Sequence, residues 1–462
     1  MTSFAGAPVL IRALRSLGVP QSVARHIHTK QRQRGYDEAS FVESFVLLNG
    51  LGGDCLDDFE RLRADAGLAE MLGYGIPSPE AARKFLYSFH DEENIAAAQQ
   101  ERLPGAIAYI PGENAALHGL GAVNRDLVQE MGRRCADQKI ATIDQDATII
   151  ESRKQEALRT YEGERGYQPM LAVLTCRKPV WAEMNLVVAD EFRDGSVPAA
   201  YQGLAVAKAA FAALPGTVRE RYYRGDSACH EPCHEHELID WLRDANRADG
   251  PAGFIGFAVS ARMSPALRAA VEAVPEARWE SYGKPDAEVI RQCADVAFVP
   301  NEHSERKNLE PLRYVAVRII ARQGGLLGGG SDRKHFAVVS NIRDWKPARL
   351  LQWHREKAGT IEAAHDVLKN ELSAGVLPCG RCGANAAWLR LAILTCNVLT
   401  ALKRLALPAE LLQARPKRLR FLFFNMAGRL VHHARKTLLR LAMSVERLAE
   451  FPEALRLLPL RA

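Results

Sequence analysis

The sequence lacks the features of a membrane-spanning or exported protein. No run of about 18 apolar residues marks a membrane span, and the N-terminus has no charged-then-apolar signal pattern. The longest apolar region, 386–402, is interrupted by Arg390, Asn397 and Thr400 and is typical of a buried helix. The nine cysteines, an odd number, do not suggest a disulfide framework. A reducing cytoplasm is therefore the simpler expectation, with no membrane partner.

The chain has the composition of a large globular protein, and its basic residues are unevenly distributed. The 462 residues can bury a large core and predict two to four domains. The net charge of +6 is small, but residues 411–440 hold eight Lys or Arg and no acid, and residues 21–35 add four more. Separated basic blocks indicate binding to a polyanion that contacts several domains. The alternative is that these residues simply form solvated surface.

The order of apolar patterns divides the chain into five parts. Residues 1–135 are predicted to be helical and to bind DNA, either through a helix-turn-helix or as a plain helical bundle, with Ser78 and Pro79 starting one helix. Residues 136–260 alternate strands and helices, which predicts an α/β core. Residues 261–345 predict a β-rich insertion, 346–385 return to helix, and 386–462 predict a basic helical region.

The stretch 139–150 predicts a strand that carries two acidic residues. Asp144 and Asp146 are two positions apart and therefore share one face of the strand. Two adjacent carboxylates repel each other unless water, cations or a divalent metal surround them. An exposed edge strand is the ordinary interpretation, and a metal site is the functional one.

Two further carboxylates support the metal interpretation. Asp226 follows a predicted strand, and Gly225 before it permits a sharp turn or a close approach. Glu362 lies on a predicted helix beside an apolar stripe. Carboxylates from two strand ends and one helix can converge at a sheet edge and hold two Mg²⁺ ions about 4 Å apart. Oxygen ligands suit Mg²⁺, with Mn²⁺ as a second possibility.

At these residues the sequence resembles the DDE transposases of bacterial insertion sequences, and most closely the insertion-sequence 1380 family. Asp146-Ala147-Thr148 resembles the first catalytic motif, Arg224-Gly225-Asp226 the second, and Glu362 with Lys369 the final Glu-Lys pair. The resemblance runs from about residue 141 to beyond 440. It implies a ribonuclease-H-like core, a mixed sheet flanked by helices, with an insertion in the 136-residue gap between Asp226 and Glu362.

The resemblance also implies an activity and partners. Family members cut and join DNA at the terminal inverted repeats of their own element, and a dimer on double-stranded DNA would hold both ends and the target. Asp146, Asp226 and Glu362 would bind the metal ions, and Lys369 would contact a phosphate. Asp144 is the other candidate ligand, although the Asp-x-Thr context favours Asp146. No small-molecule cofactor is implied.

Basic residues supply the predicted DNA contacts. Related transposases often carry a Tyr and an Arg seven and four positions before the Glu, where this chain has Arg355 and Ala358. Arg355 or Lys357 therefore becomes the candidate phosphate clamp. The other candidates lie in the two basic blocks: Lys417, Arg418 and Arg420 on a predicted C-terminal helix, and Lys30, Arg32 and Arg34 near the N-terminus.

Several alternatives remain open from the residues alone. The same metal site fits a nuclease that hydrolyses DNA without joining it, and a DNA-binding regulator would keep the carboxylates as structural groups. Cys229 and Cys233, or Cys379 and Cys382, could bind zinc, but neither cluster shows a properly spaced second half. Trp279, Trp345 and Trp353 could stack on an unpaired base, although most tryptophans are buried.

Overall fold

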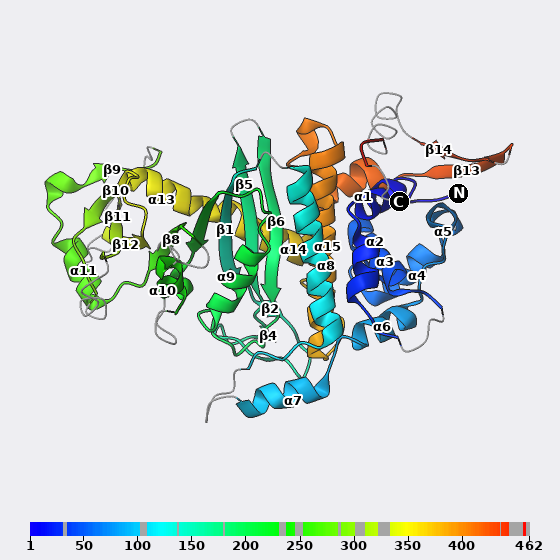
Figure 1. The fold of residues 1–462 in the computed structure, drawn as a ribbon, viewed down its shortest axis with the longest axis horizontal. Helices are drawn as coiled ribbons and strands as arrows, with labels where there is room; N and C mark the ends of the chain where they lie inside the picture. Colours follow the sequence, from blue (N-terminus) through cyan, green and yellow to red (C-terminus); the bar gives the residue numbers. More distant parts are fainter. Residues whose placement is uncertain are drawn as a thin grey trace.

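The computed structural model describes most of the chain (Figure 1). The described residues are 1–30, 35–101, 109–135, 138–178, 181–230, 237–244, 253–284, 288–300, 310–321, 333–434, 436–442 and 456–458.

The N-terminal part is helical, as predicted. The hydroxyl of Ser78 accepts the Ala81 N–H at 3.2 Å, and Pro79 stands in the first turn of the helix, so the predicted helix start is confirmed. The elements are α1 (Ala7–Ser16), α2 (Val19–His26), α3 (Glu38–Leu51), η1 (Leu56–Asp58), α4 (Phe59–Arg63), α5 (Ala66–Leu72), α6 (Pro79–Tyr87), α7 (Glu92–Glu101) and α8 (Ala115–Arg134).

A nine-stranded mixed sheet forms the centre of the molecule, in the order β6-β5-β1-β7-β8-β12-β11-β10-β9. Its strands are β1 (Ile140–Ala147), β5 (Met170–Lys178), β6 (Trp181–Glu191), β7 (Glu220–Gly225), β8 (Ile255–Ala261), β9 (Glu280–Ser281), β10 (Val289–Val296), β11 (Arg313–Ala321) and β12 (Arg333–Ser340). A small separate sheet contains β2 (Ile150–Glu151), β3 (Leu158–Arg159) and β4 (Arg165–Tyr167).

The strand that carries the first two aspartates lies inside the sheet. β1 pairs in antiparallel fashion with β5 and in parallel with β7. Ile143 and Asp144 point to opposite faces, and both are fully buried. The interpretation of 139–150 as an exposed edge strand is therefore wrong.

The strands predicted for the β-rich part are present, and they extend the same sheet. β12 pairs in antiparallel fashion with β8, with Ser340 opposite Ala258, and β11 and β10 follow in register. Among the described residues, the short β9 forms that edge of the sheet. The described part of 261–345 is thus a continuation of the central sheet, joined by α11 (Pro265–Glu272) and η3 (Glu276–Arg278).

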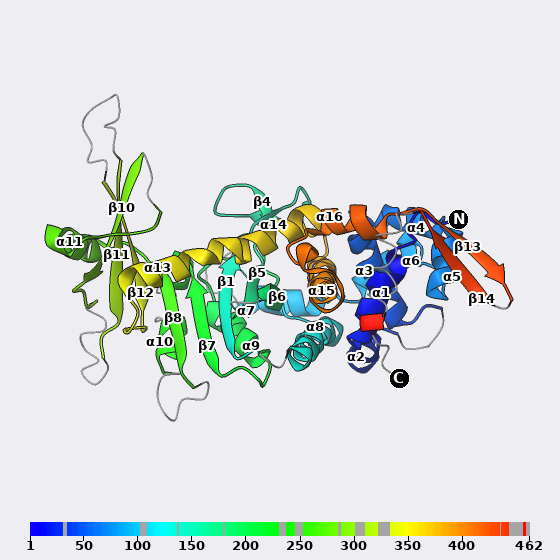
Figure 2. The same cartoon turned by 90° about the horizontal axis from the view of Figure 1, so that it is seen from above.

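Helices cover both faces of this sheet (Figure 2). One face packs against α9 (Gly203–Ala212) and α10 (Glu237–Asp244), and η2 (Ser227–His230) follows β7. Across the other face run α13 (Pro347–Arg355), η4 (Glu356–Gly359) and α14 (Ile361–Glu371), as one track from β10 and β8 to β1 and β5. This track carries Glu362 and both candidate phosphate clamps.

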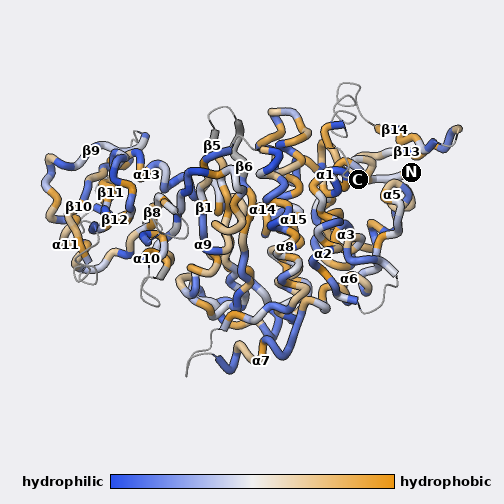
Figure 3. The backbone as a smooth tube through the Cα atoms, in the orientation of Figure 1, coloured by the Kyte–Doolittle hydropathy of each residue, from blue (hydrophilic) through white to orange (hydrophobic). Residues whose placement is uncertain are grey.

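The helix α15 (Cys382–Ala406) joins the sheet to the N-terminal helices, packing against β6, α8 and α3. In Figure 3 most of the α15 tube has the colours of hydrophobic residues. By length and composition α15 alone among the described helices could cross a membrane, but 89% of its most apolar window is buried within the protein. The sequence prediction of a buried helix for 386–402 is confirmed.

The C-terminal region departs from the predicted helix. After η5 (Ala409–Leu411), α16 (Pro416–Leu419) and η6 (Arg420–Phe424), the chain forms an antiparallel hairpin of β13 (Gly428–His433) and β14 (Lys436–Leu441). The helical prediction was wrong for these residues because their short alternation of apolar and basic positions fits either period. Ala434, with φ of 48°, makes the turn, and Gly428 pairs with Thr2, which fixes the strand.

Candidate active site

The parallel pairing of β1 and β7 places two carboxylates side by side. Gln145 of β1 lies opposite Gly225 of β7, so the next residues, Asp146 and Asp226, are neighbours where the two strands end. The carboxyl ends of parallel strands are the usual place for ligands in such sheets. Asp226 is held there by the Ala228 N–H, which donates to its carboxylate at 3.0 Å.

Gly225 permits the sharp turn at this position. A Cβ at residue 225 would lie 2.7 Å from the Sγ of Cys229, closer than side-chain atoms normally approach. The close approach predicted for this glycine is confirmed. The chain can therefore turn directly from β7 into η2 and present Asp226 at the strand end.

The electrostatics around Asp146 are those of a crowded acidic site. Burial raises the pKa of the Asp146 carboxyl to about 6, and the nearby Asp226 carboxylate raises it as well. The Lys357 ammonium lies 3.4 Å from the Asp146 Oδ2 and opposes this shift. One lysine therefore faces two carboxylates, an arrangement that a divalent cation would stabilise.

The α13–η4–α14 track is fixed over the ends of β1 and β7 by side-chain bonds. His354 makes a 3.1 Å hydrogen bond with the Gly225 carbonyl, and burial lowers the His354 pKa to about 4, so the ring is neutral and donates. Lys369 donates to the Thr148 hydroxyl at 3.2 Å and to the Ile149 carbonyl at 2.9 Å. Glu362 lies on the track between these two anchors.

Glu362 occupies the first turn of α14 and is exposed. It precedes Lys369 by seven residues, two helical turns, so the two side chains leave the helix in nearly the same direction. Lys369 contacts the end of β1, which places Glu362 on the same side of the sheet. His365 is buried on this helix, and burial lowers its pKa to about 3, with Lys369 and Lys357 adding to the shift.

Asp144 occupies a different environment from Asp146. It is fully buried, and Arg224 donates to both of its carboxylate oxygens, at 2.6 and 2.7 Å. The hydroxyls of Thr360 and Thr175 donate to the same carboxylate. Since every Asp144 oxygen already has a partner inside the protein, this geometry favours Asp146, whose side chain is 19% exposed, as the ligand of the pair.

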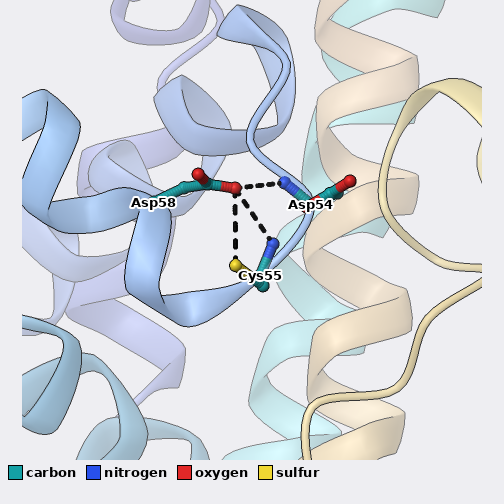
Figure 4. A group of neighbouring side chains, drawn as sticks. All are labelled: Asp54, Cys55 and Asp58. Atoms are coloured by element: carbon teal, nitrogen blue, oxygen red, sulfur yellow. Dashed lines mark hydrogen bonds between the residues drawn. The ribbon is translucent and has the colours of Figure 1, made fainter.

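One group of metal-ligand type lies elsewhere in the described part of the chain. The ligand atoms of Asp54, Cys55 and Asp58 lie within 4.8 Å of one another (Figure 4), a closeness that Asp146, Asp226 and Glu362 do not reach. The Asp58 carboxylate accepts the Asp54 and Cys55 N–H groups at 2.9 and 3.3 Å. These bonds cap η1, so the group is a local turn structure.

The candidate zinc cysteines have other neighbours. Tyr223 donates to the Sγ of Cys229 at 3.3 Å, and burial raises the Cys229 pKa to about 12. Cys379 bonds to Asn385 at 3.5 Å, and Cys382 is buried. Cys233 lies outside the described residues.

The predicted DNA contacts divide into exposed and occupied side chains. Arg355, Lys417 and Arg418 are exposed. Arg420 donates to the carbonyls of Asn49, Gly50 and Glu371, so its guanidinium is used within the protein.

Near the N-terminus, Lys30 donates to the Tyr36 carbonyl and lies 5.4 Å from the centre of the Phe41 ring. Arg32 and Arg34 lie outside the described residues.

The three candidate tryptophans are all engaged. Trp279 is buried with the Arg318 guanidinium 4.4 Å from its ring, and Trp345 packs edge-on against Trp353 at 5.4 Å. A further aromatic residue, which the sequence did not indicate, lies within electrostatic range of the carboxylates. Tyr161 is 74% exposed in the turn after β3, and Asp146 and Asp226 are among the groups that raise its pKa, after burial and Glu162.

Comparison with known proteins gives the following. A family model described as "Transposase DDE domain group 1" matches residues 1–462. A search of curated proteins found no match. Among solved structures, the cryo-EM structure of a piggyBac transposase synaptic complex with hairpin DNA aligns with a TM-score of 0.43 and 11% identity, covering 90% of this chain and 79% of that one.

Proposed function

The chain belongs to the family described as "Transposase DDE domain group 1", and from this premise we propose that it cuts and joins DNA by two-metal chemistry at Asp146, Asp226 and Glu362. The observation that carries the proposal is the register of β1 and β7, which sets Asp146 beside Asp226. Glu362 stands on α14, which Lys369 anchors to Thr148 and Ile149 just after β1.

The residues fit a divalent ion of the hard type. All three candidate ligands are carboxylates, and the pKa of Asp146 is raised first by burial and then by the neighbouring Asp226 carboxylate. When bound, two such ions would activate the attacking water or 3′-hydroxyl and stabilise the leaving oxygen. Mg²⁺ is the proposed ion, with Mn²⁺ as a substitute.

Lys357 takes the part of the phosphate clamp. The arginine common in related transposases would stand at Ala358, and Lys357 precedes that position by one residue. Its ammonium reaches 3.4 Å from Asp146, so a phosphate held between the carboxylates and their ions would lie within its reach. Arg355, which is exposed two residues before Lys357, is the second candidate contact.

The finer features follow from the resemblance to the insertion-sequence 1380 family. The proposed core is ribonuclease-H-like, and the run of two antiparallel and two parallel pairs from β6 to β8 is consistent with that core. The proposed substrates are the terminal inverted repeats of the element and a target duplex. Holding both ends at once calls for a dimer on DNA.

The test is DNA cleavage and strand transfer by the full chain on its element ends with Mg²⁺ or Mn²⁺. Asp226→Asn should abolish both reactions. Asp366→Asn is the matched control on α14, because the Asp366 carboxylate pairs with Arg415 at 2.6 Å, away from the aspartates. Full activity of Asp226→Asn would refute the proposed site.

A nuclease that does not join DNA is the second candidate, because the same carboxylates would support hydrolysis. A pre-cut element end with a free 3′-hydroxyl separates the two. Joining of that end to a target plasmid supports the transposase, whereas hydrolysis without joined product supports the nuclease.

A further inference from the structure

A cavity of about 640 Å³ opens directly beside Asp226, on the same face of the sheet as the carboxylates. Strand register explains the continuity. Gly225 lies opposite Val259 of β8, which brings Asp226 next to Ser260, and Ser260 lies opposite Val338 of β12. The line of neighbouring positions that begins with Asp146 and Asp226 therefore continues across β8 and β12 into the wall of the cavity.

The cavity exists because α13 covers only part of this face. Leu350 and Leu351 of α13 pack on Ala258, Val315 and Val338, which are buried. The next positions along β11 and β12 have no such cover: Val317 and Ile319 are half-buried, and Phe336 is 51% exposed. An apolar floor with one exposed aromatic ring is left open next to the candidate active site.

Arginines stand around this apolar floor. Arg262, Arg291 and Arg355 line the cavity, and the Arg355 guanidinium lies 5.9 Å from the centre of the Tyr282 ring. Tyr282 is itself held by its N–H, which donates to the Arg291 carbonyl at 2.9 Å. Among the lining residues Asp226 is the acidic group, and it lies at the end that meets the active site.

We propose that this cavity binds one unpaired nucleotide of the DNA strand whose neighbouring phosphate is cut at Asp226. The base would stack on Phe336, and Arg262 and Arg355 would contact the flanking phosphates. An aromatic face with cationic neighbours suits a nucleobase between two phosphates, and the volume is within the range of small-ligand sites. A duplex could not place a paired base against Phe336. This proposal rests on the proposed function in one respect only, namely that the bound DNA strand is the one that is cut.

Binding in the absence of metal tests the cavity separately from catalysis. The probe is a ten-nucleotide oligothymidylate that carries one central 2-aminopurine, mixed with the full chain in EDTA. Stacking on Phe336 should quench the 2-aminopurine fluorescence. Phe336→Ala should remove the quenching and weaken binding by between about 5-fold and 150-fold, and Phe336→Trp should restore both.

Phe254→Ala is the matched control, because Phe254 is 58% exposed just before the opposite end of β8. It should bind the probe as the wild type does. Arg262→Ala and Arg355→Ala should each reduce the salt slope of binding by about 0.7, the value for one phosphate contact on a single strand. The measurement in EDTA involves no metal and no cleavage, so a failure of the catalytic proposal leaves it unaffected.

Three results would overturn the assignment. Equal quenching and affinity in Phe336→Ala and the wild type would show that the base lies elsewhere. Equally strong competition by a blunt duplex of the same length would show that the surface does not select an unpaired nucleotide. Photo-cross-linking of a 5-iododeoxyuridine version of the probe should label Phe336 or Tyr282, and labelling confined to other elements would also contradict the proposal.

Discussion

Arg224 and Asp144 are direct neighbours on parallel strands, and their side chains form a two-bonded ion pair of 2.6 and 2.7 Å in the interior of the sheet. The Arg224 guanidinium also donates to the Trp353 carbonyl at 2.5 Å, which ties the pair to α13. Two residues further along the same strands, the neighbours are Asp146 and Asp226. The neutralised pair Arg224–Asp144 thus lies in the sheet two positions before the acidic pair Asp146–Asp226.

The first prediction concerns this pair. Arg224→Ala should lower the free energy of unfolding by about 3–5 kcal/mol, because it leaves the fully buried Asp144 carboxylate without its counter-ion. Urea unfolding followed by circular dichroism measures the loss. The control is Arg63→Ala, which breaks the exposed Arg63–Glu60 pair and should change stability by less than about 1 kcal/mol. Equal losses in both variants would contradict a structural role for the buried pair.

The second prediction concerns the pH dependence of stability. The folded pKa of Asp146, about 6, exceeds the ordinary value of 3.8, so between these pH values the folded state binds the extra proton. The stability contributed by this group is therefore present below about pH 4 and is lost as pH rises through 6.

Asp146→Asn should remove that loss. The metal-free variant should be more stable than the wild type at pH 7.5, by up to about 3 kcal/mol, and equal to it near pH 4. Urea midpoints at the two pH values measure the difference. A variant that is less stable at pH 7.5 would show that the carboxylate is favourably placed when ionised.

The third prediction concerns metal binding. Mn²⁺ should raise the thermal midpoint of the wild type at pH 7.5 and raise it much less at pH 5.5, because Asp146 must lose its proton to bind the ion. Asp146→Asn and Asp226→Asn should remove the increase, whereas Asp58→Asn, in the exposed turn at η1, should leave it intact. An unchanged increase in both active-site variants would place the ion elsewhere.

Features that depend on neighbours within one strand or helix were predictable from the sequence. Contacts between residues far apart in the chain were not. The strand 139–150, the turn at Gly225 and the cap at Ser78 follow from short-range patterns that the fold preserves. The partners of Asp144 could not be predicted, since Arg224 and Thr360 are 80 and 216 residues away. The central position of β1 was missed because its buried Asp144 is neutralised by Arg224 of the neighbouring β7, a pairing that a local pattern does not reveal. The C-terminal hairpin was missed because Gly428 finds its partner at Thr2.

The fourth prediction concerns Lys357. Lys357→Met should reduce cleavage at saturating metal by at least about tenfold, because the ammonium next to Asp146 can no longer contact a phosphate. Lys357→Arg should retain most activity, since the positive charge remains. The rate of strand cleavage under single-turnover conditions measures both. The control for loss of a buried lysine is Lys403→Met. Lys403 lies on α15 and donates to the Ala414 carbonyl.

The fifth prediction separates two uses of arginine and lysine at the C-terminal basic segment. Arg420 donates to the carbonyls that end α3 and α14, so Arg420→Ala should destabilise the fold by about 2–4 kcal/mol. Lys417 and Arg418 are exposed beside it, and replacing both by Ala should leave stability unchanged within about 0.5 kcal/mol.

DNA binding should show the opposite order. The Lys417→Ala, Arg418→Ala double variant should reduce the salt slope of duplex binding by up to about 2, because each exposed cation can neutralise one phosphate. Arg420→Ala, measured at a temperature where it remains folded, should keep the wild-type slope. Fluorescence anisotropy with a labelled duplex between 50 and 200 mM salt gives the slopes. A reduced slope for Arg420→Ala alone would show that its guanidinium leaves the α3 carbonyls to contact DNA.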